Sequence, residues 1–278
     1  MSIDLAGKTA LVTGASAGIG REIARVLARE VGALVLVARR RERLDELARE
    51  LTAPPGGSAS TPARPGLRVV IRDVDLADRP AIGAMLDALA REGERIDVLI
   101  NNAGLGDNAF FHESEWPKLE RMLEVNVVAA TYLLHRLVPG MVARGSGAIL
   151  NVGSSAGMIA RPEMVAYSAT KAFLNLLSEG MRAELAGTGV SVTSLCPGPV
   201  PTEFQGVAGT RSKHPMPEIF HVDAVQCAEE AVAALKAGRA RIIPGLPMRA
   251  AMVALEAVPK AAVRPVLARM AAKIQQRG

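Results

Sequence analysis

Short apolar segments alternate along the first 200 residues with longer segments whose apolar residues recur at helical spacing. A nearly continuous apolar run is typical of a strand in a parallel sheet, because such a strand is covered on both faces. The expected strands are Thr9–Thr13, Ala33–Ala38, Leu67–Arg72, Asp97–Asn101, Ala148–Val152, Val190–Leu195 and Arg241–Ile243. The expected helices are Ile19–Val31, Glu42–Leu51, Pro80–Glu92, Trp116–Arg144, Met164–Ala186 and Asp223–Ala237. This alternation predicts an α/β fold, a single domain with a doubly wound parallel sheet of about seven strands and helices on both faces.

Composition narrows the class of protein. Of the 278 residues, 49% are hydrophobic and 22% are charged, which excludes a chain that is disordered throughout. Two cysteines, Cys196 and Cys227, are too few for a disulfide framework, and the N-terminal sequence has no signal-peptide pattern. No apolar stretch reaches about 18 residues without a charge, so a membrane-spanning helix is not expected. We therefore expect a cytoplasmic protein.

The net charge of +5 is distributed unevenly. Residues 236–278 carry nine basic side chains and one acidic side chain, a net charge of +8, which leaves −3 for residues 1–235. Aromatic residues make up only 3% of the chain. The basic residues do not form a face across the fold, and aromatic side chains for base stacking are scarce. No nucleic-acid partner is therefore expected.

The first strand is followed by the turn TGASAGIG, residues 13–20, which opens the first helix. Glycines at such a turn let the backbone curl tightly and approach a pyrophosphate closely. The N-terminus of the helix presents unpaired N–H groups and the positive end of its dipole to the anion. The turn therefore predicts a Rossmann-type dinucleotide site that contains Gly14, Ser16, Gly18, Ile19 and Gly20.

The end of the second expected strand indicates which dinucleotide binds. A site that prefers NAD has an acidic residue there, about 20 positions after the glycine turn, on the ribose 2′-hydroxyl. This chain has Arg39, followed by Arg40 and Arg41. A guanidinium binds a 2′-phosphate through paired, charge-assisted hydrogen bonds, so NADP(H) is favoured over NAD(H), with Arg39 and Arg40 as ligands. Alternatively the arginines form the solvated start of the next helix, which fits Arg41 best.

Four motifs occur together, in an order and at positions that identify a family. They are the turn TGASAGIG, Asn101-Asn102-Ala103-Gly104, Tyr167-x-x-x-Lys171 and Pro197-Gly198. In combination they resemble the short-chain dehydrogenase/reductase family, and the similarity extends from Lys8 to about Pro244. The segments VLVARRRERLDEL, GSSAGMIARPEMVAYSATKAF and LCPGPVPTEF are most similar to the NADPH-dependent ketone and 3-ketoacyl reductases of that family. The resemblance implies a homodimer or homotetramer assembled through the helices of residues 116–144 and 164–186.

Tyr167 and Lys171 are four residues apart on an expected helix and therefore share one face. An isolated tyrosine hydroxyl, with a pKa of roughly 10, is a poor acid or base near neutral pH. We expect the ammonium and the oxidised nicotinamide ring to lower that pKa, so that a proton passes between Tyr167 and the substrate oxygen during hydride transfer. The resemblance implies that Ser154, three residues before Gly157, hydrogen-bonds that oxygen, and that Asn126 holds a water linking Lys171 to solvent. Taken singly, each residue also has a purely structural explanation.

The resemblance implies further cofactor contacts at the carboxyl ends of strands, where an open parallel sheet binds its ligands. Asp73 and Val74 match the residues that contact the adenine. The loops after the fourth and sixth strands lie over the cofactor and hold the nicotinamide carboxamide, and the catalytic helix holds the nicotinamide ribose. These positions are Asn101, Ala103, Gly104, Pro197, Gly198, Val200, Thr202, Tyr167 and Lys171.

Residues 202–222 form the expected substrate lid. An apolar pocket, and hence a hydrophobic carbonyl substrate such as a fatty acyl chain or a ring system, is predicted from Phe204, Met216, Ile219, Phe220, Phe110, Met158 and Ile159. The basic lid residues Arg211, Lys213 and His214 fit either a solvated loop or the phosphates of a coenzyme A thioester. The four histidines show neither metal-ligand nor triad spacing, so no metal site is expected.

We expect a catalytic domain over residues 1–245 and a basic helical extension over residues 246–278. One face of that extension is apolar (Val263, Val266, Leu267, Met270 and Ile274) and is flanked by Arg264, Arg269, Lys273 and Arg277. Such a helix is expected to dock on its own body or on a partner subunit. Peripheral contact with an anionic membrane is the alternative. The segment of residues 52–66, rich in Pro, Gly, Ser and Ala, is interpreted as a tolerated surface loop.

Three functions fit the sequence. The first is NADPH-dependent reduction of a carbonyl, or the reverse oxidation of the matching secondary alcohol. The second, an NAD-linked alcohol dehydrogenase, is opposed by Arg39. The third, a non-catalytic NADP(H)-sensing protein, is opposed by the joint presence of Ser154, Tyr167 and Lys171.

Overall fold

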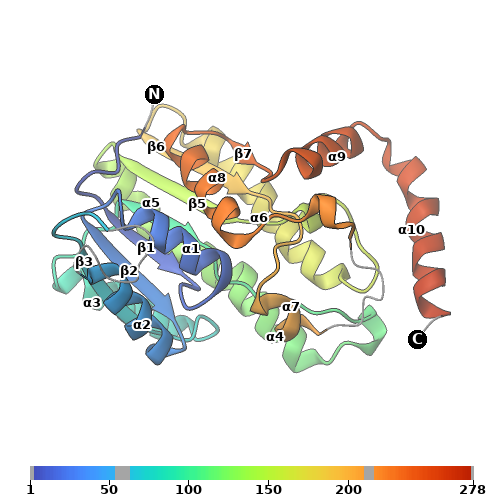
Figure 1. The fold of residues 1–278 in the computed structure, drawn as a ribbon, viewed down its shortest axis with the longest axis horizontal. Coiled ribbons are helices and arrows are strands. Elements are labelled where there is room, and N and C mark those ends of the chain that lie inside the picture. The colour runs from blue at the N-terminus through green and yellow to red at the C-terminus, as the bar shows by residue number, and fades with distance from the viewer. Residues whose placement is uncertain (1–2, 54–62, 210–215, 277–278) are drawn as a thin grey trace.

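Seven parallel strands form one sheet in the order β3-β2-β1-β4-β5-β6-β7, which confirms the predicted fold (Figure 1). The computed structural model describes residues 3–53, 63–209 and 216–276. The strands are β1 (Thr9–Thr13), β2 (Ala33–Ala38), β3 (Arg68–Asp73), β4 (Val98–Asn101), β5 (Gly147–Val152), β6 (Val190–Leu195) and β7 (Arg241–Ile242). The helices are α1 (Gly18–Leu27), α2 (Arg41–Thr52), α3 (Arg79–Arg91), α4 (Trp116–Leu123), α5 (Ala130–Ala143), α6 (Val165–Glu184), α7 (Glu203–Ala208), α8 (Ala224–Lys236), α9 (Leu246–Glu256) and α10 (Lys260–Gln275).

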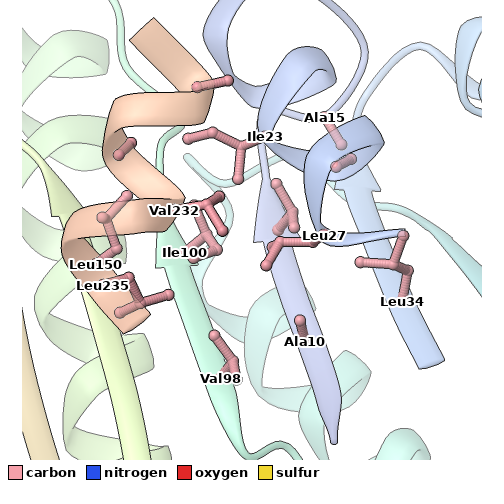
Figure 2. Close-up of a cluster of buried hydrophobic side chains, with 14 of the residues drawn as sticks. Ala10, Ala15, Ile23, Leu27, Leu34, Val98, Ile100, Leu150, Val232 and Leu235 are labelled. Carbon is pink, nitrogen blue, oxygen red and sulfur yellow. The ribbon is translucent and has the colours of Figure 1, made fainter. Parts of the chain in front are cut away.

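Successive residues of the central strands pack on opposite faces of the sheet, as the pleat requires. Ala10 and Val12 of β1 pack with α1, α2 and α8, whereas Leu11 between them packs with α3 and α5. Figure 2 shows the first of these layers, in which helices α1 and α8 lie over the strands through Ile23, Leu27, Val232, Leu235, Ala10, Val98, Ile100 and Leu150. Because both faces are covered, the strands have the continuous apolar sequences from which they were predicted.

The strand order reverses at β1. The chain builds outward to β2 and β3 on one side, then returns to place β4 on the other side of β1. The loops that leave the carboxyl ends of β1 and β4 diverge at this point, so a crevice opens between them. The ligand site of this fold is therefore expected at the carboxyl ends of the central strands.

The single helix expected over residues 116–144 is divided into three parts. Helix α4 is followed by a π-helical segment, Glu124–Ala129, and then by α5. Among the described residues, Trp116–Ala143 is the one helical stretch whose length and composition would suffice to cross a membrane. In this structure its residues Leu133, Leu134 and Met141 are buried in the core.

The C-terminal extension has two different parts. Helix α9 packs on the body, because Met248 and Met252 are buried with Cys196 and Ile243. Helix α10 buries none of its residues and stands away from the sheet (Figure 1). The described part of the body therefore does not bury α10, so docking on a partner subunit and contact with a membrane stay predictions. The division at residue 245 also stays a prediction, although α9 packs with the body. Most of the loop of residues 52–66, together with Arg211, Lys213, His214 and Arg277, lies outside the described residues.

Candidate active site

A cavity of about 530 Å³ lies at the carboxyl ends of the strands. Its wall comes from the loops after β1, β2, β3, β4, β5 and β6, together with α6 and the beginning of α7. The sequence-predicted residues in that wall are Gly14, Ser16, Gly18, Ile19, Arg39, Arg40, Val74, Ala103, Gly104, Ser154, Tyr167, Lys171, Pro197, Gly198, Val200 and Thr202. One cavity thus brings together the expected cofactor contacts and most of the expected catalytic residues.

The turn after β1 is shaped for close approach to a ligand. Gly14 has φ +67°, which side chains rarely adopt, and a Cβ atom there would lie 2.7 Å from Nδ2 of Asn102. That amide nitrogen donates to the carbonyl oxygen of Thr13 at 2.8 Å and so holds the turn against the loop after β4. The N-cap of α1, Ala17, supplies no side-chain hydrogen bond, which leaves the first N–H groups of the helix available to an anion. The turn fits a dinucleotide pyrophosphate.

Arginines occupy the adenosine end of the cavity, as expected for a 2′-phosphate. Arg40 Nη2 lies 3.2 Å from the Ser16 hydroxyl, which places a guanidinium and a hydroxyl side by side as phosphate donors. Arg40 Nη1 also donates to Oε2 of Glu203 at 2.9 Å, and Arg43 binds the other carboxylate oxygen. Hydrogen bonds from Arg43 and Arg40 lower the pKa of Glu203 to about 2. The donor set fits NADP(H), and Glu203 is a carboxylate in the same site that the sequence did not indicate.

Tyr167 and Lys171 are both buried, and burial dominates their electrostatics. It raises the pKa of Tyr167 to about 12, against smaller lowering effects from a hydrogen bond with Ser154 and from the charge of Arg161. It lowers the pKa of Lys171 to about 8. Lys171 Nζ donates to the carbonyl oxygen of Val152 at 2.8 Å and lies 5.9 Å from the centroid of the Tyr167 ring. In the polypeptide alone, burial therefore outweighs the effects that lower the pKa of Tyr167. That the ammonium and the oxidised nicotinamide ring together lower this pKa stays a prediction.

Asn126 lies outside the cavity wall, in the π-helical segment. Its Oδ1 accepts from the N–H of Leu105 at 2.8 Å, and its Nδ2 donates to Leu105 O at 2.9 Å and to Oγ1 of Thr170 at 3.0 Å. These bonds join the loop after β4 to the turn of α6 that carries Lys171. A Cβ at Gly104 would meet Lys171 Nζ at 3.2 Å and Asn126 Oδ1 at 3.4 Å, so the three residues converge.

Three expected cofactor residues lie outside the cavity wall, each with a structural reason. Gly20 packs against Asn102, whose Nδ2 atom would be 2.2 Å from a Cβ at that position. Asn101 Nδ2 donates to Oδ1 of Asn151 on β5 at 2.9 Å and so joins two strands. Asp73 is exposed and accepts from Arg41 at 3.4 Å. Asn102, Asp75 and Leu76, their neighbours in sequence, line the wall instead.

The substrate end of the cavity differs in part from the sequence prediction. Phe204 lies with its ring centroid 5.5 Å from that of Tyr167, and Met164, Ala208 and Met216 add further apolar surface. Ile219 is exposed, and Phe110 lies outside the wall. Met158, Ile159 and Phe220 pack instead in the cluster beside α9.

Several functional candidates in the wall were missed by the sequence prediction, and Arg161 is the most prominent. Arg161 lies between Ser154 and Tyr167 in sequence, within a loop. A loop has no hydrophobic periodicity, so the sequence does not indicate that this side chain points into the cavity. Among the residues that the structure describes, no group of three His, Cys, Asp or Glu side chains is placed to hold a metal ion.

Comparisons with known proteins agree with this geometry. The family model described as short chain dehydrogenase matches residues 8–212. The NADP-dependent 3-hydroxy acid dehydrogenase YdfG of Escherichia coli (strain K12) is 38% identical over 199 residues, which are 71% of this chain and 75% of that protein. Glycine betaine reductase ATRR of Emericella nidulans is 34% identical over 204 residues, which are 73% of this chain but only 15% of that longer protein. The solved short-chain dehydrogenase from Sphingobium yanoikuyae in complex with NADPH has a TM-score of 0.76 and 32% identity, covering 94% of this chain and 95% of its own.

Proposed function

We propose a substrate class for this chain, which belongs to the short-chain dehydrogenase family and is an NADP(H)-dependent oxidoreductase acting on CH–OH and C=O groups. The enzyme reduces the carbonyl of a largely hydrophobic substrate, or oxidises the matching secondary alcohol. The observation that carries the proposal is the position of Ser154, Tyr167 and Lys171 in one wall, beside the apolar side chains of Met164 and Phe204. A ketone bound there would have its apolar part against Met164 and Phe204 and its oxygen towards Ser154 and Tyr167.

NADPH, when bound, supplies the hydride, and the polypeptide supplies the proton and the orientation. Tyr167, with its pKa raised to about 12, is a neutral phenol near pH 7 and can donate a proton to the carbonyl oxygen as negative charge develops there. The Ser154 hydroxyl, which lies in the same wall and lowers the pKa of Tyr167, would stabilise the same oxygen. The phenolate left behind lies near the Lys171 ammonium and within the field of Arg161. Asn126 positions Lys171 by joining Leu105 to Thr170. We also propose that Asn126 holds a water that links Lys171 to solvent.

The remaining contacts of the cofactor follow from the wall of the cavity. Arg39, Arg40 and Ser16 would hold the 2′-phosphate, and the turn at Gly14 and Gly18 the pyrophosphate. Lys171 would also hold the nicotinamide ribose. The loop after β6, which contains Pro197, Gly198, Val200 and Thr202, would hold the carboxamide.

The functional unit is proposed to be a homodimer or homotetramer in the cytoplasm. The outer face of α6 supports this proposal, because Leu176 is 75% exposed and Phe173 is 41% exposed on a helix that the resemblance places at an interface. Helix α10, which none of the described residues buries, is proposed to dock on a neighbouring subunit. Contact of α10 with an anionic membrane is the alternative.

A substrate screen tests the proposed activity. Purified chain is mixed with NADPH and with matched sets of ketones, aldehydes and acyl thioesters, and NADPH absorbance is followed. We expect turnover with a subset of hydrophobic carbonyl compounds and slower turnover with NADH. NADPH binding without turnover on any member would contradict the proposed reaction.

A further inference from the structure

Arg161 is a cation in the wall of the substrate end of the cavity. It lies in the loop between β5 and α6, in the same wall as Ser154 and Tyr167, and it is half-buried. It makes no hydrogen bond, and no ion pair within 4.0 Å, with any residue that the structure describes. Lys171, by contrast, has the Val152 carbonyl oxygen as its partner. A half-buried guanidinium has given up part of its hydration, so an anion that pairs with it is stabilised more than it would be at an open surface.

The loop that carries Arg161 holds it in a defined place. Glu163, two residues later, is 6% exposed and has φ +64°, a left-handed conformation that is uncommon for a side-chain-bearing residue. Local strain of this kind is maintained only where the surroundings impose it, and it is concentrated at functional sites. Burial lowers the pKa of Arg161, while the charge of Glu163 acts in the opposite direction. Glu163 is therefore a nearby counter-charge that does not occupy the hydrogen-bonding fork of the guanidinium.

The position of Arg161 favours the substrate over the cofactor as its ligand. The cofactor's phosphates have their own donors at the other end of the wall, at the turn after β1 and at Arg39 and Arg40. The charge of Arg161 reaches Tyr167, so the guanidinium lies near the place where the reacting oxygen is expected. The same wall includes Met164, Phe204 and Met216, which suit an apolar chain. A planar fork of donors matches a carboxylate in a bidentate arrangement.

We propose that Arg161 binds a carboxylate on the substrate, so that the enzyme prefers oxo acids whose apolar chain carries the carboxylate close to the carbonyl. This inference rests on the proposed function, because it names the substrate class of the same site. The expected substrate is then an amphipathic oxo acid rather than a ketone without a charged group. The guanidinium acts as a specificity residue that binds the carboxylate and takes no part in the transfer of hydride or proton, so its effect is expected mainly in KM.

Matched substrates and variants test the inference. Pyruvate, acetoacetate and 4-oxopentanoate differ in the separation of ketone and carboxylate, and each is compared with its ethyl ester, which lacks the charge. Wild-type enzyme is expected to reduce at least one acid with a higher kcat/KM than its ester. Arg161→Met should lower kcat/KM for that acid by roughly 10- to 100-fold through KM, the range expected for a lost charged hydrogen bond, and change the ester less than about threefold.

Two further variants provide controls. Arg91→Met removes an exposed guanidinium at the end of α3, outside the cavity, and should leave the ratio of acid to ester unchanged. Glu163→Gln removes the counter-charge and should lower KM for the acid, which is the opposite direction to Arg161→Met. Equal losses on acid and ester in Arg161→Met would show that the residue acts on Tyr167 alone, and would overturn the inference.

A binding measurement separates failure of the inference from failure of the proposed function. Butanoate, which has no carbonyl, should raise the melting temperature of the NADPH-bound wild-type enzyme but not that of NADPH-bound Arg161→Met. If the esters are reduced and butanoate has no effect, Arg161 binds no carboxylate although the reductase activity stands. If NADPH binds and butanoate protects but no carbonyl compound is reduced, the anion site stands and the proposed reaction fails.

Discussion

Arg40 Nη1 lies 2.9 Å from Oε2 of Glu203, so a side chain expected to bind the cofactor's 2′-phosphate is paired with the first residue of α7. Both side chains line the same cavity, and both are solvent-exposed. A carboxylate in this position competes with a phosphate for the guanidinium. The pair persists through the neutral pH range, because Arg43 and Arg40 hold the pKa of Glu203 at about 2. The lid therefore pairs with an arginine that is expected to bind the 2′-phosphate of the cofactor.

Replacing Glu203 should strengthen the binding of NADPH. In Glu203→Gln the negative charge is gone and Arg40 is released, so the Kd for NADPH should fall by roughly two- to fivefold, as expected for an exposed ion pair. The Kd for NADH should not change, because NADH has no phosphate at this position. Fluorescence titration of both cofactors measures the two constants. Weaker NADPH binding in the variant would mean that Glu203 orients Arg40 for the phosphate rather than competing with it.

Arg39 should determine the preference between the two cofactors. Arg39→Asp places a carboxylate beside the 2′-phosphate, and NADPH binding should weaken by roughly 10- to 100-fold through loss of a charged hydrogen bond and gain of repulsion. NADH binding should change much less. The same titrations provide the readout, with Arg91→Met as the control for removal of an arginine elsewhere. An unchanged ratio of the two Kd values would show that Arg39 does not contact the phosphate.

Lys171 should be costly for stability and necessary for activity. Its pKa is lowered to about 8 by burial, so below pH 8 the folded protein holds a buried ammonium. Among the described residues, the hydrogen-bond acceptor of this ammonium is the Val152 carbonyl oxygen. Lys171→Met removes the ammonium beside Tyr167, so reductase activity should fall by more than about 100-fold, in the range of an acid–base contribution. The variant should nevertheless melt at a higher temperature than the wild type at pH 7.

The stability difference between Lys171→Met and the wild type should depend on pH. Between pH 8 and the ordinary lysine pKa of 10.5, the unfolded wild type still binds the proton that the folded wild type has released. Wild-type stability therefore gains over this window relative to the variant, and the difference in melting temperature should narrow as pH rises. A constant difference from pH 7 to pH 10 would show that Lys171 has an ordinary pKa in the folded protein.

Removal of α10 should lower the number of subunits in the assembly. A chain ending at Ala257 keeps Met248 and Met252, which are buried on the body, and loses only the helix with no buried residue. Light scattering is expected to show a dimer or tetramer for the full chain and a smaller particle for the shortened chain. Sedimentation with phosphatidylglycerol vesicles tests the alternative. The same number of subunits for both chains, with vesicle binding by the full chain only, would assign α10 to a membrane surface.

The strands and the order of the motifs were predictable because local pattern determines them. A parallel strand covered on both faces must be apolar throughout, and Val35 and Leu99 are fully buried as that rule requires. The turn after β1 was also predictable, because Gly14 has a φ of +67° that few other residues adopt. The Arg39–Arg40 pair follows the second strand by the same local logic.

The contacts between distant loops were not predictable. Arg40 and Glu203 are 163 residues apart, and no periodicity indicates that α7 returns to the adenosine end of the cavity. The π-helical segment around Asn126 has the same apolar spacing as the α-helices beside it, so the expected helix was unbroken. Asn101 and Asn102 are adjacent at the end of β4, where successive side chains point in opposite directions, and only Asn102 reaches the turn after β1.

Carbonyl reduction at this site depends, in our proposal, on a proton from the Tyr167 hydroxyl. The most direct test is Tyr167→Phe, which removes one hydroxyl from a buried ring packed against Phe204 and keeps the ring itself. Single-turnover reduction and NADPH titration are measured on the same preparation. We predict a loss of at least about 100-fold in the reduction rate, with the Kd for NADPH within about twofold of the wild type. Reduction at the wild-type rate by this variant would contradict the role assigned to Tyr167.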